Sequence, residues 1–481
     1  MPFAPCLLKK SGAPLRLCTF FTPPPPKNLM YNSHRECAQF LPVIKMLNSI
    51  WASTQLPHFP ALEGDHKTDV LVIGGGMAGL LCAHRLTKAG IDVTVAEADR
   101  IYGGVTGKTT AKITSQHGLI YHKLLSQLGK EQAKLYLQAH EDAVKAYYIL
   151  CKQIPCHFES QSAYVYAMND RKALEQELHA FHLLGYPAGL KEDIPLPFRT
   201  AGAVKFKRQA QFHPLEFAAH IAKDLNIFEC TPVRRLEGTT AITDNGSITA
   251  KKVIVATHFP FLNRHGSYFL KLYQQRSYVL ALENTGFSGG MYIGAEENSL
   301  SFRSCGDLLL LGGGGHRTGK KGGNWQYLSD FATNAYPNAL EVARWATQDC
   351  MSLDGIAYIG QYSKNTPNLF VATGFNKWGM TGSMVAATVL TDLVQEKESP
   401  YADLFSPSRS ILRPQLFING AESTLNLLRP TVPRCPHLGC ALKWNSIERS
   451  WDCPCHGSRF SESGQLLDDP AQKDLNNKPS G

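Results

Sequence analysis

A regular hydrophobic pattern begins after Thr68. The short apolar run Asp69–Ile73 is typical of a buried parallel strand. In the segment Leu80–Gly90 that follows, apolar residues recur at helical spacing, and the closing glycine is a natural helix cap. A second apolar run, Asp92–Glu97, ends in an acid. The pattern therefore predicts a strand, a turn, a helix and a second strand, which is how an α/β domain starts.

Two apolar segments later in the chain complete this picture. Val253–Thr257 has the composition of another buried strand. Asn368–Gly374 predicts a strand that ends in a glycine-rich turn, and a helix of small residues, Ser383–Val394, follows it. The N-terminus of such a helix can face an anionic or polarised group.

The turn after the first strand carries the glycine pattern Gly-x-Gly-x-x-Gly. Gly74 permits a tight turn, Gly76 allows a pyrophosphate to approach the backbone, and Gly79 allows the helix to pack closely on the strand. The helix N-terminus supplies N–H groups for phosphates, and Glu97, 18 residues after the last glycine, can accept hydrogen bonds from ribose hydroxyls. Together these features predict dinucleotide binding. A tight βα turn in an unrelated α/β fold is the alternative.

Length and charge exclude some classes of protein. The 481 residues predict more than one domain. The longest apolar runs are about half the roughly 20 residues that a membrane span needs, so we expect no membrane span. Of the net charge of +9, residues 1–45 carry +5, from six Lys or Arg and one acid. The remaining 436 residues show no basic stripe with interleaved aromatics, which argues against nucleic-acid binding.

Residues 1–45 differ in composition from the rest of the chain. They contain the run Pro23–Pro26, which favours polyproline II over helix or sheet. We predict a disordered or spurious extension, with Met46 as the functional start. Organelle targeting is the alternative, because the segment is basic and poor in acids.

Three later segments decide which dinucleotide is bound. They are Thr106–Ser115, Gln348–Gly360 and Asn368–Gly382. With the glycine turn, and in this order, they resemble the D-amino-acid oxidase-like family of FAD-dependent oxidoreductases over residues 68–395. The resemblance implies FAD, with the pyrophosphate on the glycine turn and the adenosine ribose on Glu97. It also implies that two loops lie along the cofactor and against its isoalloxazine ring, with the contact residues Thr106, Thr110, Gly374, Gly379, Met380 and Thr381.

The same resemblance implies a second, inserted α+β domain that covers the flavin, at about residues 155–200 and 262–345. Between the last glycines, the ring-facing loop reads Phe-Asn-Lys-Trp where many relatives have His and small residues. This departure makes the usual amino-acid substrate an open question. The candidate catalytic residues are Arg303, His316, Arg317 and Lys377. An arginine suits a planar carboxylate, and a lysine near the flavin would stabilise its reduced, anionic form. For Arg303 a structural salt bridge is the alternative, and for Lys377 an ordinary surface lysine. For the glycine run Gly312–Gly315 before His316 and Arg317, the alternative is a mobile loop.

The C-terminal segment has four cysteines and two histidines in 22 positions. The pattern C-x-H, then 15 residues, then C-x-x-H resembles a Rieske [2Fe–2S] site. This resemblance implies that Cys435 and Cys453 bind one iron and His437 and His456 the other. It also implies a Cys440–Cys455 disulfide that shields the cluster. A tetrahedral zinc site is the alternative.

Two positions in the second cysteine box predict the reduction potential. Ser458 matches a family serine that donates a hydrogen bond to a bridging sulfide, which raises the potential. Phe460 stands where high-potential members have a tyrosine and lacks the hydroxyl. We therefore expect an intermediate potential.

The other nine cysteines are scattered without a disulfide framework. Such use of cysteine as a small hydrophobe fits a reducing cytoplasm. We therefore expect a cytoplasmic protein.

From about Met46, the chain resembles bacterial fusions of a D-amino-acid oxidase-like domain (46–405) with a Rieske domain (412–481). The expected fold is an α/β Rossmann-like FAD domain with an inserted α+β substrate domain, followed by a small all-β Rieske domain. The expected activity is a dehydrogenase of an amine, amino acid or similar small molecule. Electrons would pass singly from flavin to the cluster and on to an external carrier. The alternatives are a reductase with reversed flow and a redox-responsive module without small-molecule catalysis.

Overall fold

The strand–turn–helix–strand unit predicted after Thr68 forms in a computed structural model, which describes residues 48–430 and 433–475. Strand β1 (His66–Ile73) leads into helix α2 (Met77–Lys88) and then into β2 (Val93–Ala96). The two strands pair in parallel, with Val70 opposite Val93. The prediction for residues 1–45 lies outside the described residues.

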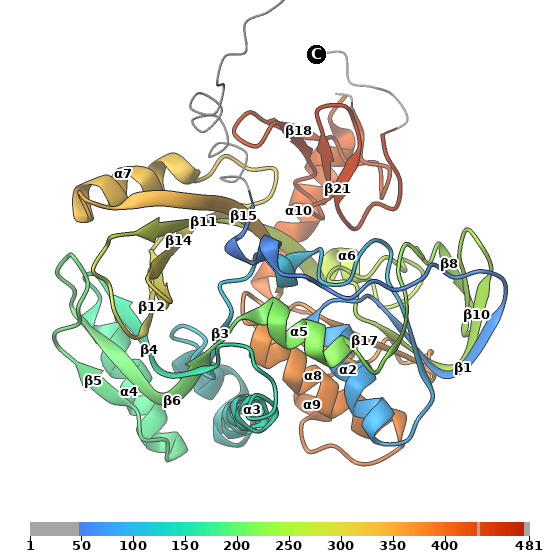
Figure 1. Ribbon diagram of the computed structural model, residues 1–481, viewed down its shortest axis with the longest axis horizontal. Helices are drawn as coiled ribbons and strands as arrows, with labels where there is room; N and C mark the ends of the chain where they lie inside the picture. Colours follow the sequence, from blue (N-terminus) through green and yellow to red (C-terminus); the bar gives the residue numbers. More distant parts are fainter. Residues whose placement is uncertain (1–47, 431–432, 476–481) are drawn as a thin grey trace, which may run out of the picture. The chain divides into compact units, whose positions relative to one another are not determined.

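This unit belongs to an eight-stranded sheet whose main path runs β16-β17-β10-β1-β2-β7. Strands β1, β10 and β17 of this sheet are labelled at the lower right of Figure 1. The antiparallel pair β8 and β9 extends it beside β10. Almost every residue of the central strands is buried, because helices cover them. The remaining strands are β7 (Asn226–Phe228), β8 (Arg235–Glu237), β9 (Thr240–Ile242), β10 (Ser247–Val255), β16 (Tyr358–Gln361) and β17 (Leu369–Thr373).

Helices pack closely on this sheet and on one another. Helix α2 packs against α8 (Gly379–Val394) and α5 (Pro214–Ala222). The long helix α3 (Tyr121–Leu150) bends at Gly129 and also packs against α8. The short helical turns are η1 (Ile50–Ser53), η2 (Val105–Lys108), α6 (Tyr268–Lys271) and α9 (Ala402–Phe405).

A nine-stranded sheet forms the second domain, with the order β15-β11-β14-β13-β12-β4-β6-β3 and β5 beside β6. Helices α4 (Arg171–Leu184) and α7 (Trp325–Ala335) pack on it. The strands are β3 (Lys112–Ile113), β4 (Glu159–Ala167), β5 (Gly189–Lys191), β6 (Gly202–Gln211), β11 (Leu272–Glu283), β12 (Met291–Gly294), β13 (Ser301–Cys305), β14 (Leu308–Arg317) and β15 (Leu340–Ser352).

Helix α10 (Pro414–Leu428) connects this body to a small antiparallel sheet of order β18-β19-β20-β21. Its strands are β18 (Lys443–Asn445), β19 (Ser450–Asp452), β20 (Arg459–Ser461) and β21 (Leu466–Asp468). The three sheets confirm the predicted fold class. The domain boundaries given above stay predictions. Within the described residues, none of the helices is both long enough and apolar enough to cross a bilayer.

Candidate functional site

A cavity of about 390 Å³ lies at the carboxyl ends of β1 and β10, where parallel α/β sheets bind their ligands. Its walls include the glycine turn, the residue that ends β2, the loop after β10 and the start of α8. Those walls are contributed by Gly74, Gly76, Glu97, Thr106, Thr257, His258, Phe259, Gly379 and Met380. The sequence therefore brings its predicted cofactor residues from four separate segments to one cavity.

The glycines of the turn act as their spacing predicts. Gly74 has a φ of 111°, and a Cβ there would lie 2.6 Å from the Ala256 carbonyl oxygen. A Cβ on Gly79 would lie 1.9 Å from the Gly74 carbonyl oxygen, so the helix could not pack on the turn. Gly76 lines the cavity. The turn thus leaves room for a cofactor that approaches the backbone closely.

Glu97 and Thr106 hold this turn in place. The Glu97 carboxylate accepts the Gly75 N–H at 2.6 Å and the Asp99 N–H at 3.0 Å. Burial raises the pKa of Glu97, and these N–H groups counteract the rise. Thr106 Oγ1 accepts the Met77 N–H at 3.1 Å, at the start of α2. Glu97 keeps further lone pairs for ribose hydroxyls, since a carboxylate can accept about four hydrogen bonds.

Some residues of the predicted ring-facing loop line the cavity, and others support those residues. Gly379, Met380 and Lys377 line the cavity, and Lys377 Nζ also donates to Ser277 Oγ at 3.2 Å. Gly374 and Thr381 are not among the lining residues; the Thr381 hydroxyl donates to the Thr114 carbonyl at 3.1 Å.

The neighbouring loop before β3 divides in the same way. Thr109 lines the cavity, whereas Thr110 does not, and its carbonyl accepts a hydrogen bond from Arg303. The structure thus places the neighbouring threonine at the position that the sequence assigned to Thr110.

His117 fixes the loop after β3 to the start of α8. Its Nε2–H donates to the Thr114 carbonyl at 2.8 Å, and its Nδ1 accepts the Tyr136 hydroxyl at 2.7 Å. The ring stacks on Trp378 with centroids 4.7 Å apart. Burial lowers the pKa of His117 to about 3, so the imidazole is neutral at physiological pH.

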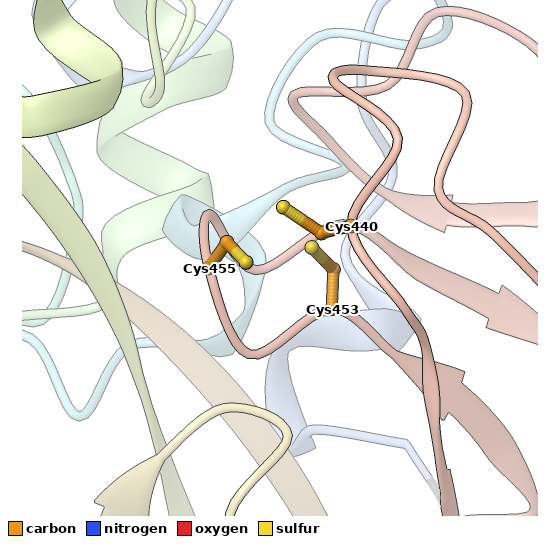
Figure 2. Close-up of side chains that lie close together, drawn as sticks. All are labelled: Cys440, Cys453 and Cys455. Carbon is orange, nitrogen blue, oxygen red and sulfur yellow. The ribbon is translucent and has the colours of Figure 1, made fainter. Parts of the chain in front are cut away.

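Two similar turns form the cysteine–histidine boxes. The Gly439 N–H donates to the Cys435 carbonyl at 2.9 Å, and the Gly457 N–H donates to the Cys453 carbonyl at 3.0 Å. The Sγ atoms of Cys440, Cys453 and Cys455 lie within 4.8 Å of one another (Figure 2). Hydrogen bonds from Cys435, and then from Cys440 and Cys455, hold the pKa of Cys453 well below its usual range. A thiol so depressed is a good metal ligand.

The two histidines of these boxes face each other. Their rings are perpendicular, with centroids 4.9 Å apart. His437 Nε2 donates to Asn263 Oδ1 at 3.2 Å, while its Nδ1 is buried and has no partner among the described residues. Within the same part of the chain, both ring nitrogens of His456 are also buried without a partner. Buried ring nitrogens without partners are what metal coordination would satisfy, so the donor set fits an iron–sulfur cluster.

One aromatic side chain connects the cavity with these histidines. Phe259 is fully buried and lines the cavity. Its ring centroid lies 6.2 Å from that of His437 and 6.1 Å from that of His456, edge-on in both cases. A single ring therefore separates the cavity from both histidines.

The second box packs directly on the nine-stranded sheet. Gly457 has a φ of 90°, and a Cβ there would lie 2.2 Å from Gln274 Cγ in β11. Its carbonyl accepts Gln348 Nε2 from β15 at 2.9 Å. Only a glycine can approach the sheet this closely.

A buried charge network forms the rest of this interface. Arg276 of β11 pairs with Glu448, which also accepts the Tyr278 hydroxyl at 3.1 Å. Arg459 pairs with Glu448 at 2.9 Å and with Asp468 at 2.9 Å. Removing one partner would leave a buried charge unpaired, which is strongly destabilising. The small sheet is thus held at one position on β11.

Comparison with protein families now identifies the larger part of the chain. A sequence model of the DAO family, described as FAD dependent oxidoreductase, matches residues 69–393. The chain belongs to this family of FAD-dependent oxidoreductases. A model of the Rieske [2Fe–2S] domain matches residues 423–479. The cofactors of this FAD-dependent oxidoreductase are therefore FAD and a [2Fe–2S] cluster, as the sequence predicted.

One relative is similar over nearly the whole chain, and others over part of it. YhfW of Bacillus subtilis (strain 168), which is named as a Rieske 2Fe-2S iron-sulfur protein, is 35 % identical over 489 residues, 88 % of this chain and 96 % of the relative. Gamma-glutamylputrescine oxidoreductase of Escherichia coli (strain K12) is 27 % identical over 41 % of this chain and half of its own. Glycine oxidase from Geobacillus kaustophilus superposes with a TM-score of 0.61 at 20 % identity, over 72 % of this chain and all of that one. At 20 % identity, the similarity to glycine oxidase is one of fold alone.

Two of the candidate catalytic arginines of this FAD-dependent oxidoreductase are engaged with protein atoms. Arg303 is buried away from the cavity and donates to the Phe212 carbonyl at 2.9 Å, to Thr110 and to Gln211. Burial lowers its pKa to about 10. Arg317 donates to the Pro454 carbonyl at 3.2 Å and to Asn419 at 2.9 Å. These hydrogen bonds connect both arginines to other parts of the protein.

The other two candidates lie in different places. His316 stacks on Tyr278, with centroids 5.8 Å apart, and is not among the lining residues of the cavity. Lys377 does line it. The structure thus brings one of the four candidates to the cavity.

Sequence reasoning missed several residues of this wall, including Asp349. Asp349 of β15 faces the cavity, and burial raises its pKa while Lys377 and His258 counteract the rise. Phe259 was missed as well. The available signal was its place in the loop after β10, four residues past the carboxyl end of a parallel strand.

The thiols of Cys440 and Cys455 are both free in this structure. Their disulfide therefore stays a prediction, as do the ligand roles of Cys435, His437, Cys453 and His456.

Proposed function

We propose that this chain is a dehydrogenase that oxidises an amine, an amino acid or a similar small molecule. It sends the electrons through the Rieske centre to an external one-electron carrier. The observation that carries this proposal is the position of Phe259, which lines the cofactor cavity and touches both cluster histidines. A cluster next to the cofactor cavity offers electrons an exit other than O₂.

FAD supplies two-electron oxidation of the substrate, and a [2Fe–2S] cluster accepts one electron at a time. The chain's own residues fix the geometry between these two sites. Phe259 lies between the cavity and the His437 ring. Asn263 Oδ1 accepts the Nε2–H of His437 and so fixes the orientation of that ring. That hydrogen bond leaves Nδ1 unprotonated, as an iron ligand must be.

The charges of the cavity support an amine as the group recognised. Arg303 and Arg317 donate to protein atoms, and Arg276 pairs with Glu448. Asp349 and Lys377 are the charged groups that β15 and the ring-facing loop present to the cavity. An Asp349 carboxylate would attract an ammonium group. The names of the E. coli relative and of the glycine oxidase also refer to an amine and an amino acid.

A cytoplasmic location is part of this proposal. Buried thiols such as Cys82 and Cys350 suit a reducing compartment. The external carrier would be a protein or small molecule of the same compartment.

An anaerobic substrate screen tests the proposal. The protein is mixed without O₂ with a panel of amines and amino acids, and the flavin absorbance is followed. We expect one class to bleach the flavin and then reduce the cluster. Flavin that is reduced only by electrons entering through the cluster would instead indicate a reductase. The third outcome is a cluster that can be reduced and reoxidised while the flavin responds neither to a substrate nor to electrons from the cluster. That outcome would indicate a redox-responsive module.

A further inference from the structure

The cofactor cavity has a wall that comes from the Rieske domain. Residues Asp469–Gln472, here called the tail segment, follow strand β21 directly. All four line the cavity, together with Leu466 of that strand. The other walls include the glycine turn and Glu97, more than 350 positions earlier in the chain.

Hydrogen bonds fix the tail segment to the FAD domain. Gln472 Nε2 donates to the Val233 carbonyl at 3.3 Å, and Arg234 donates to the Gln472 carbonyl at 2.9 Å. Val233 and Arg234 line the same cavity. The tail segment thus spans from the small β-sheet to a loop of the nucleotide-binding domain.

A second contact fixes the segment to the cluster boxes. The Ala471 N–H donates to Ser458 Oγ at 3.0 Å, and the Ser458 carbonyl accepts the Cys453 N–H at 2.9 Å. Ala471 is buried. The neighbouring residues Ala471 and Gln472 therefore join the cluster loop to the cavity wall.

The contacts of Gln472 place the tail segment beside a particular half of the cofactor. Gln472 reaches Val233, and Thr231, two residues before Val233, donates its N–H to the Glu97 carbonyl at 2.8 Å. Glu97 stands at the end of β2, where the ribose of a dinucleotide binds. The tail segment thus covers the adenosine half of the cavity.

We propose that the tail segment is part of the FAD site and that the Rieske domain thereby retains the cofactor. FAD can leave through this wall only when the hydrogen bonds of Gln472 break and Asp469 moves away. Retention of this kind does not depend on the direction of electron flow. It predicts that FAD release is controlled by residues outside the FAD domain.

The test is the rate of FAD release from the full chain loaded with both cofactors. The double variant Asp469→Ala/Gln472→Ala removes the side chains that contact the cavity and Val233, and leaves the cysteines and histidines in place. We expect the fluorescence that marks released FAD to appear about tenfold faster or more, since each lost contact lowers the barrier to release. The EPR signal of the cluster should keep its intensity.

Glu462→Ala is the matched control. Glu462 is an exposed residue of the same domain, pairs with Arg449 and is not among the lining residues of the cavity. Its FAD release rate should equal that of the unsubstituted protein. Release from the double variant at the control rate, with the cluster loaded, would overturn the proposal.

Hydrogen–deuterium exchange gives a second test that needs no substitution. The amides of Ala471 and Gln472 are compared in the cluster-loaded protein before and after removal of FAD. We expect several-fold faster exchange without FAD, because the segment loses the cofactor that it covers. Equal exchange in both states would contradict the proposal.

Discussion

Single residues differ in how far their roles could be inferred from the sequence. Gly79 packs against the carbonyl of Gly74, five residues earlier, so the spacing of these two glycines predicts its role. Arg303 and Arg317 have partners about 90 and 140 residues away along the chain. An arginine suits a substrate carboxylate, but only the folded chain shows which carbonyl groups the two guanidinium groups contact.

Phe460 provides a test at the residue scale. Its ring is fully buried in β20 and packs with the cluster cysteines. Phe460→Tyr adds a hydroxyl donor, which should raise the reduction potential because hydrogen bonds to the cluster stabilise its reduced form. A gain of about 1.4 kcal/mol corresponds to about 59 mV for a one-electron couple. Redox titration monitored by EPR measures the shift.

Phe460→Leu is the control, because it alters the packing without adding a donor. Its potential should stay near that of the unsubstituted protein. An equal shift in both variants, or none with tyrosine, would sink the hydrogen-bond explanation.

At the scale of elements, hydrophobic pattern located the buried strands well. The apolar runs that predict β1, β2, β10 and β17 became parallel strands in the order that binds a dinucleotide. The second sheet was harder to delimit, because its strands alternate with long connections and pair across them. Strand β3, for example, pairs with β6 about 100 residues later and lies inside the predicted cofactor loop.

The pH dependence of the free energy of unfolding tests whether neutral, buried His117 holds the loop after β3 against α8. The pKa of His117 falls from the ordinary 6.5 to about 3 on burial, so below pH 6.5 the unfolded chain binds a proton that the folded chain does not. Its contribution to stability is complete above pH 6.5 and is lost as the pH falls toward 3, by up to about 1.4 kcal/mol per pH unit.

Urea unfolding at pH 7.5 and at pH 5.0 measures this loss. Between these pH values the unsubstituted protein should lose about 2 kcal/mol more stability than His117→Gln, since other groups titrate equally in both. Parallel pH profiles would show that His117 is not held neutral.

At the scale of the whole molecule, the sequence predicted both modules but not their arrangement. The motifs identify the FAD site and the cluster site because each is built from local spacing. The contacts that join them involve Gly457 on Gln274, Arg276 with Glu448, and the tail segment in the cavity. None of these pairs has a spacing signal, since each depends on two surfaces that fold separately and then meet.

Electron exchange between flavin and cluster within one chain is tested most directly by light. The anaerobic protein is illuminated at the flavin absorption band with EDTA as electron donor, and the reduced cluster is followed by EPR. The signal should rise with a first-order rate that does not change with protein concentration. Cys435→Ser should bind FAD and give no such signal. A flavin that bleaches while the cluster stays oxidised, or a rate proportional to protein concentration, would contradict direct transfer past Phe259.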